Sequence, residues 1–248
     1  MRISRIYLPL DVETIESDVV VAGEKAHYIR NVLRLKIGQE LNFFIPAGVE
    51  YRTRVDTISK HEVTLSVIEA LNDSAPASTL NTTLVQGISS SDRMDYSIQK
   101  AAELGCTRLV PVFSDFCSVK IAEHKRDKKL QHWQAVAIGA SEQSGRCDIM
   151  QVEAIQNLSE VVKQTVQGIY LEPTATTHLY QMPESMQQSL SVFIGPEGGF
   201  SPTEITSFND QGLLGIQLGQ RVLRTETVAP VILAGLQVLF GDFKPPDE

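Results

Sequence analysis

The sequence predicts an α/β protein in which a small β-rich N-terminal domain precedes a larger domain built on a parallel sheet. Two observations carry this prediction. Residues 3–68 contain four segments of strand composition with one short helix candidate among them. From residue 82 onward, strand and helix patterns alternate to the end of the chain. Such alternation is typical of a parallel sheet with helices on both faces.

Segments rich in β-branched and aromatic residues predict the strands of the first domain. In the clearest of them, Tyr51 and Val55 alternate with charged residues. The helix candidate, 24–35, ends before Gly38, and its apolar and basic residues fall on different faces. The predicted strands are 3–8, 41–45, 51–58 and 63–68.

A polar stretch of small residues, 71–78, is predicted to be the linker, which places the domains at 1–72 and 73–248. The second domain is predicted to have strands over 82–86, 109–113, 149–152, 168–171, 191–194 and 215–218, and helices over 92–104, 125–141, 158–166, 202–209 and 225–239.

Size and composition narrow the class of protein. The 248 residues are 42% apolar and 21% charged, enough for a buried core. The longest apolar stretch, 228–240, contains Pro230 and Gln237 and is too short to cross a bilayer, so we expect a core helix. We expect no secretory signal at the N-terminus and no membrane association. The 3 cysteines are widely spaced, which favours reduced thiols, a cytoplasmic location and no metal site.

Charge is unevenly distributed along the chain. The formal net charge is −8, which argues against general nucleic-acid binding. Basic residues nevertheless outnumber acidic ones in 25–54 and in 120–129. This distribution is compatible with RNA binding at a restricted face.

Two glycine-rich segments near the C-terminus, Phe193–Glu204 and Leu218–Thr227, each have the pattern strand, turn, helix start. A capping box from Ser201 to Glu204 marks one helix start, and Thr225 is expected to cap the other. Both turns fall at the carboxyl edge of the predicted sheet, where ligands of such sheets bind. We expect their backbone groups to wall a pocket for a small polar cofactor. The alternative is a pair of tight connections with no ligand.

Other ligand classes lack their motifs. The sequence contains no phosphate-binding G-x-x-x-x-G-K-[ST], no dinucleotide-binding G-x-G-x-x-G, no H-E-x-x-H and no G-x-S-x-G. A phosphate-binding hydrolase is therefore disfavoured. The pattern that remains is a backbone-lined pocket without a metal, a nucleophile or a phosphate clamp.

Five motifs in one order resemble a known family. They are Val32–Lys36, Asp92–Asp95 with Gln99–Lys100 and Glu103–Gly105, Glu142–Arg146, Ile194–Ser201, and Leu218–Gly219 with Leu223–Thr227. Together they resemble the RsmE family, the 16S ribosomal RNA uridine-N3 methyltransferases of the SPOUT class, over nearly the whole chain. The chain departs from the family pattern at Ser90, Ser91 and Phe116. An arginine is usual at the last position, so one RNA or interface contact of the family is in doubt here.

The resemblance implies an N-terminal PUA-like β-barrel that binds RNA and a C-terminal parallel sheet with a deep trefoil knot. It also implies S-adenosylmethionine bound in the knot, a homodimer, and 16S rRNA within the small ribosomal subunit as substrate. The residues implied to bind the cofactor are Leu171, Glu172, Gly195, Pro196, Glu197, Gly198, Gly199, Leu218, Gly219, Leu223, Arg224 and Thr225.

The chemistry of uracil suggests roles for the charged residues near these loops. N3 becomes nucleophilic once its proton leaves, and negative charge then spreads over the flanking carbonyl oxygens. We expect Arg93 or Arg224 near those oxygens, because a guanidinium is planar and always charged. Glu197 or Glu226 is expected to accept the proton or to orient that arginine. The RNA-contacting candidates are Lys25, Arg30, Arg34, Arg52, Arg54, Arg146 and Arg221.

Two other functions remain open at this point. One is a related SPOUT methyltransferase that acts on another RNA position, such as a ribose 2′-oxygen. The other is a non-catalytic RNA-binding adaptor that keeps the barrel and has lost the cofactor.

Overall fold

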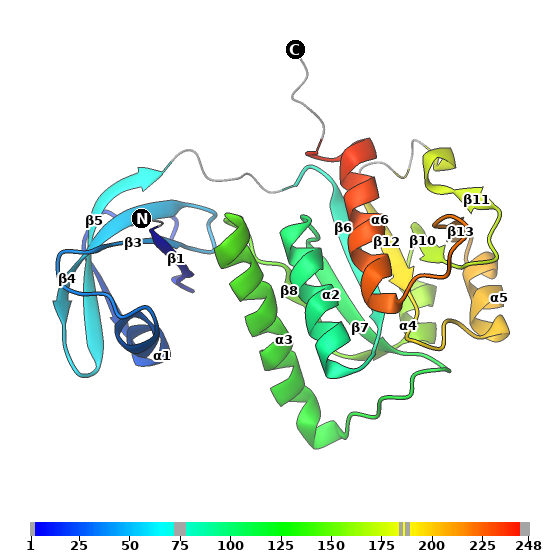
Figure 1. Ribbon diagram of the computed structural model, residues 1–248, viewed down its shortest axis with the longest axis horizontal. Helices are drawn as coiled ribbons and strands as arrows, with labels where there is room; N and C mark the ends of the chain where they lie inside the picture. Colours follow the sequence, from blue (N-terminus) through cyan, green and yellow to red (C-terminus); the bar gives the residue numbers. More distant parts are fainter. Residues whose placement is uncertain (1–2, 72–77, 184–185, 187–188, 244–248) are drawn as a thin grey trace, which may run out of the picture. The chain divides into compact units, whose positions relative to one another are not determined.

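The computed structural model describes residues 3–71, 78–183, 186 and 189–243 (Figure 1). The chain forms two compact units. The first comprises Met1–Ala77 together with Ser141–Ile149, and the second comprises Ser78–Ala140 and Met150–Glu248. The predicted boundary between residues 72 and 73 lies outside the described residues.

The first unit contains a five-stranded sheet in the order β1-β3-β4-β5-β2. β1 runs parallel to β3, and the other pairs are antiparallel. The end strands β1 and β2 send Ile6 and Val21 into the same core as Leu41, Val55 and Leu65, so the sheet curls around one core. The strands are β1 (Ser4–Tyr7), β2 (Val19–Ala22), β3 (Glu40–Phe44), β4 (Glu50–Ile58) and β5 (Glu62–Leu71).

The predicted helix of this unit is shorter than expected. α1 (Gly23–His27) continues directly into one π-helical turn, η1 (Tyr28–Val32). Ala26 and Ile29 are buried, as the apolar face predicts. The helix stops before residue 35 because Arg34 has φ 55°, in the left-handed region that ends helices.

The segment Ser141–Ile149 joins the first unit through Arg5 of β1. The Arg5 guanidinium donates to the carbonyl oxygens of Ser141 (2.8 Å) and Arg146 (2.7 Å) and pairs with Glu50 at 2.9 Å. A buried guanidinium needs such partners, since an unpaired charge away from water is costly. One of the predicted motifs, Glu142–Arg146, is thus held against the curled sheet.

The second unit contains an eight-stranded sheet in the order β11-β13-β10-β12-β6-β7-β8, with β9 paired to β7. All pairs within the described part of this sheet are parallel. The predicted fold class is confirmed here. The strands are β6 (Asn81–Gly87), β7 (Arg108–Phe113), β8 (Gln151–Val152), β9 (Gln156–Asn157), β10 (Gly168–Leu171), β11 (Thr177–His178), β12 (Ser189–Ile194) and β13 (Leu214–Gln217).

Helices cover both faces of this sheet. Successive strand residues point to opposite faces, so Leu84 and Val192 pack in one core while Val85 and Phe193 pack in another. The first core includes residues of α2, α3 and α6, and the second includes residues of α4 and α5. The helices are α2 (Ser91–Glu103), α3 (Glu123–Ser144), α4 (Leu158–Gln164), α5 (Pro202–Asp210) and α6 (Thr225–Phe240).

The apolar stretch near the C-terminus forms α6, as predicted, and it buries Ile232, Leu233 and Leu236. Within the described ranges, no helix combines the length and apolar character needed to cross a membrane. The neighbouring strands β6, β12, β10 and β13 end side by side at one edge of the sheet. The loops that follow them form the candidate site.

Candidate cofactor and RNA site

A cavity of 510 Å³ lies beyond the carboxyl ends of the central strands of the second unit. The loop after β12, the loop after β10 and the start of α6 all line it. Ten of the twelve residues predicted to bind a cofactor line this cavity. The exceptions are Leu218 and Gly219, since this segment of the chain joins the lining only from Val222 onward. The predicted catalytic residues Arg93, Glu197, Arg224 and Glu226 line it too.

The two glycine-rich segments are joined by one buried hydroxyl. Thr225 Oγ1 donates to the carbonyl oxygen of Gly195 at 2.7 Å and accepts from Gln86 Nε2 at 3.2 Å. The expectation that Thr225 caps α6 is wrong: the N-cap is Arg224, and no side chain makes a cap hydrogen bond there. The hydroxyl contacts the other loop instead. Sequence reasoning missed Gln86, a fully buried amide whose strand position gives no sign of this role.

Close backbone approach explains the glycines of the first loop. A Cβ atom on Gly195 would lie 3.0 Å from Gly199 Cα, and Gly199 has φ 73°. A Cβ on Gly87, at the end of β6, would lie 2.5 Å from the nitrogen of Pro196. The loop therefore folds onto itself and onto β6, which leaves its peptide groups beside the cavity. Sequence reasoning also missed Gly87.

The predicted capping box at the start of α5 is confirmed. Ser201 Oγ accepts from the Glu204 N–H at 3.2 Å, and the Glu204 carboxylate accepts from the Ser201 N–H at 2.7 Å. Ser201 Oγ also donates to Asp115 Oδ2 at 2.5 Å. These bonds fix the end of the glycine-rich loop.

Three charged groups meet at one side of the cavity. Arg93, in the first turn of α2, pairs with Glu197 at 2.7 Å and with Glu226 at 3.5 Å. Glu197 also accepts a hydrogen bond from the Ser90 N–H at 3.2 Å. In contrast, Glu226 Oε2 is buried and has no hydrogen-bond partner among the described residues. The fourth predicted catalytic residue, Arg224, is exposed at the rim.

The contacts of Glu197 set its charge. Partial burial raises the pKa of Glu197, but hydrogen bonds from its own N–H, from Ser90 and from Arg93 outweigh this and lower that pKa below its ordinary value. The same pair raises the pKa of Arg93, chiefly through the hydrogen bond to Glu197. Glu197 is therefore a carboxylate held in its ionised form.

Two of the departures from the family pattern flank this loop. A Cβ on Gly198 would lie 2.8 Å from Phe116 Cβ, so the aromatic residue packs directly against the glycine. The Phe116 side chain is half exposed, and the backbone of Ser90 binds Glu197. Both positions thus contact the cavity wall rather than lie apart from it.

Several residues that were predicted to contact RNA form ion pairs with carboxylates inside the first unit. Lys25 pairs with Glu142 at 2.9 Å. Arg52 pairs with Glu40 at 2.8 Å and with Glu69 at 3.3 Å, and these bonds raise the pKa of its guanidinium. The remaining case is Arg146, which is buried and paired with Asp148. The structure therefore does not support these three as free cations.

Other predicted RNA contacts are differently placed. Arg34, Arg54 and Arg221 are exposed. The Arg30 guanidinium donates to backbone carbonyl oxygens of the β4–β5 turn.

Over the part of the chain that the structure describes, no three His, Cys, Asp or Glu side chains form a group that could hold a metal. All 3 cysteines are free thiols.

These features define a two-unit protein with a curled five-stranded sheet in one unit and a backbone-lined cavity on the parallel sheet of the other. Family models agree: one described as an RNA methyltransferase domain matches residues 76–237, and one described as an RNA methyltransferase PUA domain matches residues 21–68. The chain belongs to the RNA methyltransferase family.

Similar proteins of named activity narrow the comparison further. The chain is 31% identical to ribosomal RNA small subunit methyltransferase E of Buchnera aphidicola from Schizaphis graminum, over 97% of this chain and 98% of the relative. It is 27% identical to the protein of the same name from Bacillus subtilis, over 96% of this chain and 99% of that one. The resemblance inferred from the five motifs is confirmed.

Solved structures agree with these relatives. The chain is similar to ribosomal RNA small subunit methyltransferase E from Neisseria gonorrhoeae bound to S-adenosyl methionine, with TM-score 0.89 and 30% identity over 98% of this chain and 100% of that one. It is equally similar, with TM-score 0.89 and 33% identity over the same shares, to a methyltransferase from Legionella pneumophila in complex with the same cofactor.

Proposed function

We propose that this protein is an S-adenosylmethionine-dependent methyltransferase that methylates N3 of a uridine in 16S ribosomal RNA. The observation that carries the proposal is the hydrogen bond between Thr225 and Gly195, which joins the two glycine-rich loops around one cavity. Two structural neighbours hold S-adenosylmethionine, as their names state. Relatives named for methylation of small-subunit ribosomal RNA match nearly the whole chain.

The cavity fits this cofactor. The loop residues Gly195, Gly198 and Gly199 line it, and a Cβ on Gly199 would meet nothing within 4 Å, so backbone groups of this loop would be open to an adenosine. Carboxylates of Glu172, Glu197 and Glu226 line the same cavity and suit a positively charged sulfonium. When bound, the cofactor supplies a methyl group activated by that sulfonium.

The contacts of the two central glutamates divide their roles. Glu197 is held ionised by Arg93 and the Ser90 N–H, so it orients the guanidinium. Glu226 Oε2 is buried, accepts no hydrogen bond from any described residue and contacts Arg93 only as an ion pair at 3.5 Å, so it is the less engaged of the two carboxylates and the better placed to take a proton. We assign Glu226 as the acceptor of the N3 proton and Arg93 as the group that stabilises negative charge on the uracil oxygens.

The transfer then balances simply. The Glu226 carboxylate would accept the proton of the broken N3–H bond, and the bound cofactor would supply the methyl group that N3 gains and would be left as a neutral thioether. A base attacked at its Watson–Crick edge must be unpaired or extruded from a helix. Arg224, exposed at the cavity rim, is placed to contact such a base or its phosphate.

RNA binding is assigned to cations that pair with no carboxylate of the described residues. They are the half-buried Arg30 and the exposed Arg34 and Arg54 of the first unit, and the exposed Arg221 beside the cavity. Lys25, Arg52 and Arg146 are left out, because carboxylates already match their charge. The basic stretch and the PUA-domain match of the first unit both support this assignment.

The assembly and setting are also proposals. Val231 and Val238 lie two helical turns apart on α6 and are 43% and 55% exposed. The family resemblance implies a homodimer and a trefoil knot in this unit. The apolar stripe supports α6 as the dimer interface. Free cysteines support a reducing cytoplasmic setting, where the small ribosomal subunit is the expected substrate.

The experiment is methyl transfer from labelled S-adenosylmethionine to small ribosomal subunits that lack the modification, followed by mass spectrometry of the nucleosides. The expected product is 3-methyluridine. A 2′-O-methylated nucleoside would instead identify a related methyltransferase of different specificity. No transfer, combined with no heat of cofactor binding in calorimetry, would identify a non-catalytic RNA-binding adaptor.

A further inference from the structure

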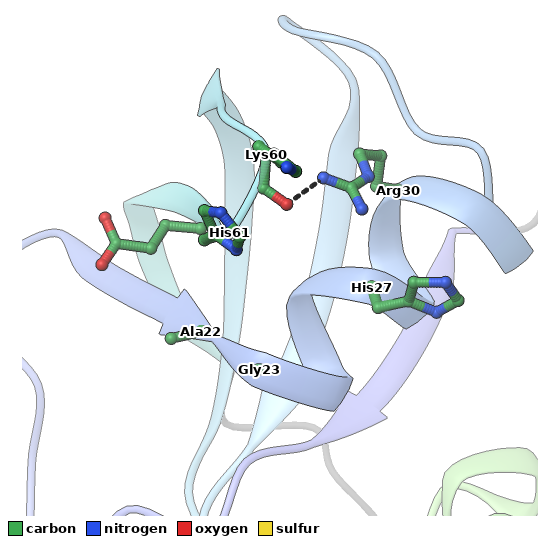
Figure 2. A pocket seen from close by; sticks show the side chains of 7 residues that line it. Ala22, Gly23, His27, Arg30, Lys60 and His61 are labelled. Carbon is green, nitrogen blue, oxygen red and sulfur yellow. Dashed lines mark hydrogen bonds between the residues drawn. The ribbon is translucent and has the colours of Figure 1, made fainter.

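A cleft of 390 Å³ in the first unit shares no lining residue with the methyl-transfer cavity. Figure 2 shows it between the helical segment and the β4–β5 turn. His27 and Arg30 line it from the helical side, and Lys60, His61 and Glu62 line it from the turn and β5. Four of these five side chains are basic, and Glu62 is the single acid.

Arg30 is fixed in this cleft by neutral oxygens. Its Nη1 donates to the carbonyl oxygen of Ser59 at 2.9 Å and to that of Lys60, the contact drawn in Figure 2. Its Nε donates to the side-chain oxygen of Asn31 at 3.3 Å. Nη2 makes no hydrogen bond to any residue within the described ranges. The guanidinium is therefore held in place while its positive charge and its Nη2 donor stay available.

This arrangement differs from that of the other anchored cations of the unit. Each of those is paired with a carboxylate: Arg5 with Glu50, Lys25 with Glu142, Arg52 with Glu40 and Glu69, and Arg146 with Asp148. Carbonyl oxygens orient a guanidinium without cancelling its charge. The Arg30 guanidinium is thus held in one orientation and pairs with no carboxylate of the described residues. An anion-binding site requires both properties.

We infer that this cleft binds a backbone phosphate of the RNA substrate, with Nη2 of Arg30 as its principal donor. A charge-assisted hydrogen bond from Nη2 suits a phosphate oxygen, and the Lys60 ammonium adds a second charge from the opposite wall. Lys60, His27 and His61 are all exposed, so the cleft is open to solvent and a polynucleotide backbone can enter and leave it. This inference rests on the proposed function and adds a specific contact to it.

The test measures binding of the full-length protein to a transcript of 16S rRNA over a series of salt concentrations. Arg30→Gln is expected to weaken binding about tenfold, on the scale of one lost charge-assisted hydrogen bond. The slope of log K against log salt should fall by about 0.7 to 0.9, the value for one phosphate contact. Arg52→Gln is the matched control: it removes the same charge from the same unit, but that charge is already paired, so the slope should stay unchanged.

A second variant guards against a folding artefact, because Arg30 also ties the β4–β5 turn. The double change Lys60→Gln and His61→Gln alters only exposed side chains of the cleft and should lower affinity and slope without lowering the melting temperature. Inorganic phosphate at millimolar concentration should compete weakly with RNA for the wild type and not for Arg30→Gln.

Two results would overturn the inference. One is wild-type affinity and slope in both cleft variants; the other is an equal loss in Arg52→Gln. Methyl transfer by the wild type is measured in parallel. If the cleft variants bind RNA as the wild type does and the wild type transfers methyl groups, the inference about the cleft is wrong and the proposed function stands. If RNA binding depends on the cleft but the wild type transfers no methyl group, the proposed function is wrong and the cleft still binds RNA.

Discussion

The hydroxyl of Thr225 lies 2.7 Å from the carbonyl oxygen of Gly195, and this one hydrogen bond joins two loops that are 30 residues apart in the chain. The bond is buried, and Gln86 of β6 completes it from a third element. Because buried polar groups are costly when unpaired, the contact specifies how the two loops sit around the cavity.

Thr225→Val tests that contact. The substitution keeps the shape of the side chain but leaves the Gly195 carbonyl and a Gln86 N–H without their partner, so unfolding should become easier by about 1–3 kcal/mol. We expect weaker S-adenosylmethionine binding in calorimetry and a lower urea midpoint. Thr227→Val, at an exposed position of the same helix, is the control and should change neither. Equal behaviour of the two variants would contradict the role of Thr225.

Gly87→Ala tests the packing of the first loop against β6. The added Cβ would meet the Pro196 nitrogen at 2.5 Å, so the loop must move. We expect a stability loss of about 1–3 kcal/mol, as in overpacked cores, together with weaker cofactor binding. In Gly139→Ala the added Cβ meets nothing within 4 Å, and this exposed change in α3 should stabilise the protein by about 0.5–1 kcal/mol. Wild-type cofactor affinity in Gly87→Ala would contradict this packing account.

Glu226→Gln and Glu197→Gln separate proton acceptance from positioning. Glu226→Gln removes the general base and should lower kcat by about 10² to 10⁴ with little change in cofactor affinity. Glu197→Gln weakens the contact with Arg93 and should lower kcat about tenfold, the effect of one weakened charge-assisted hydrogen bond. Single-turnover methyl transfer measures both. A larger defect in Glu197→Gln than in Glu226→Gln would reverse the assigned roles.

The lowered pKa of Glu197 also predicts a pH dependence of stability. Its folded-state pKa lies below the ordinary value, so the ionised side chain stabilises the fold above the ordinary glutamate pKa of about 4.3. This contribution is lost as the pH falls through the lower, folded-state value. The difference in unfolding free energy between wild type and Glu197→Gln should be constant from neutral pH down to about 5 and shrink below about 4.3. A difference that grows on acidification would contradict the pKa direction.

Val231→Asp probes the proposed dimer. A charge in the exposed apolar stripe of α6 should favour the monomer, because an unpaired buried carboxylate is costly in an interface. Sedimentation velocity should show a dimer for the wild type and a monomer for the variant. Val166→Asp, at a 95% exposed valine outside α6, should remain dimeric. A monomeric wild type would remove the dimer proposal.

Much of the fold follows from local patterns. The predicted strand 168–171 and the helix start at Thr225 match β10 and α6, because each has a strong periodic or compositional signal. β2 was not predicted, since Val19–Ala22 is only 4 residues long and follows a polar stretch. β9 and β11 have 2 residues each, too few for any period to show.

The site divides in the same way. The glycine-rich loops could be predicted from the sequence because their unusual residues are contiguous. The carboxylate partners of Arg52 could not be predicted, because the register of the strands brings Glu40 and Glu69 next to Arg52. The same holds for Arg5, which contacts Ser141 across 136 positions of the chain. Long-range pairing of this kind decides which cations remain available for RNA, and local composition carries no record of it.

The most direct test of the account is a crystal structure of the protein with S-adenosylmethionine. We predict the adenosine in the 510 Å³ cavity, bound by peptide groups of residues 195–199 and 222–225, with the sulfonium methyl facing Arg93 and Glu226. Cofactor density at any other place, or loops that close this cavity with their own side chains in the presence of saturating cofactor, would contradict it.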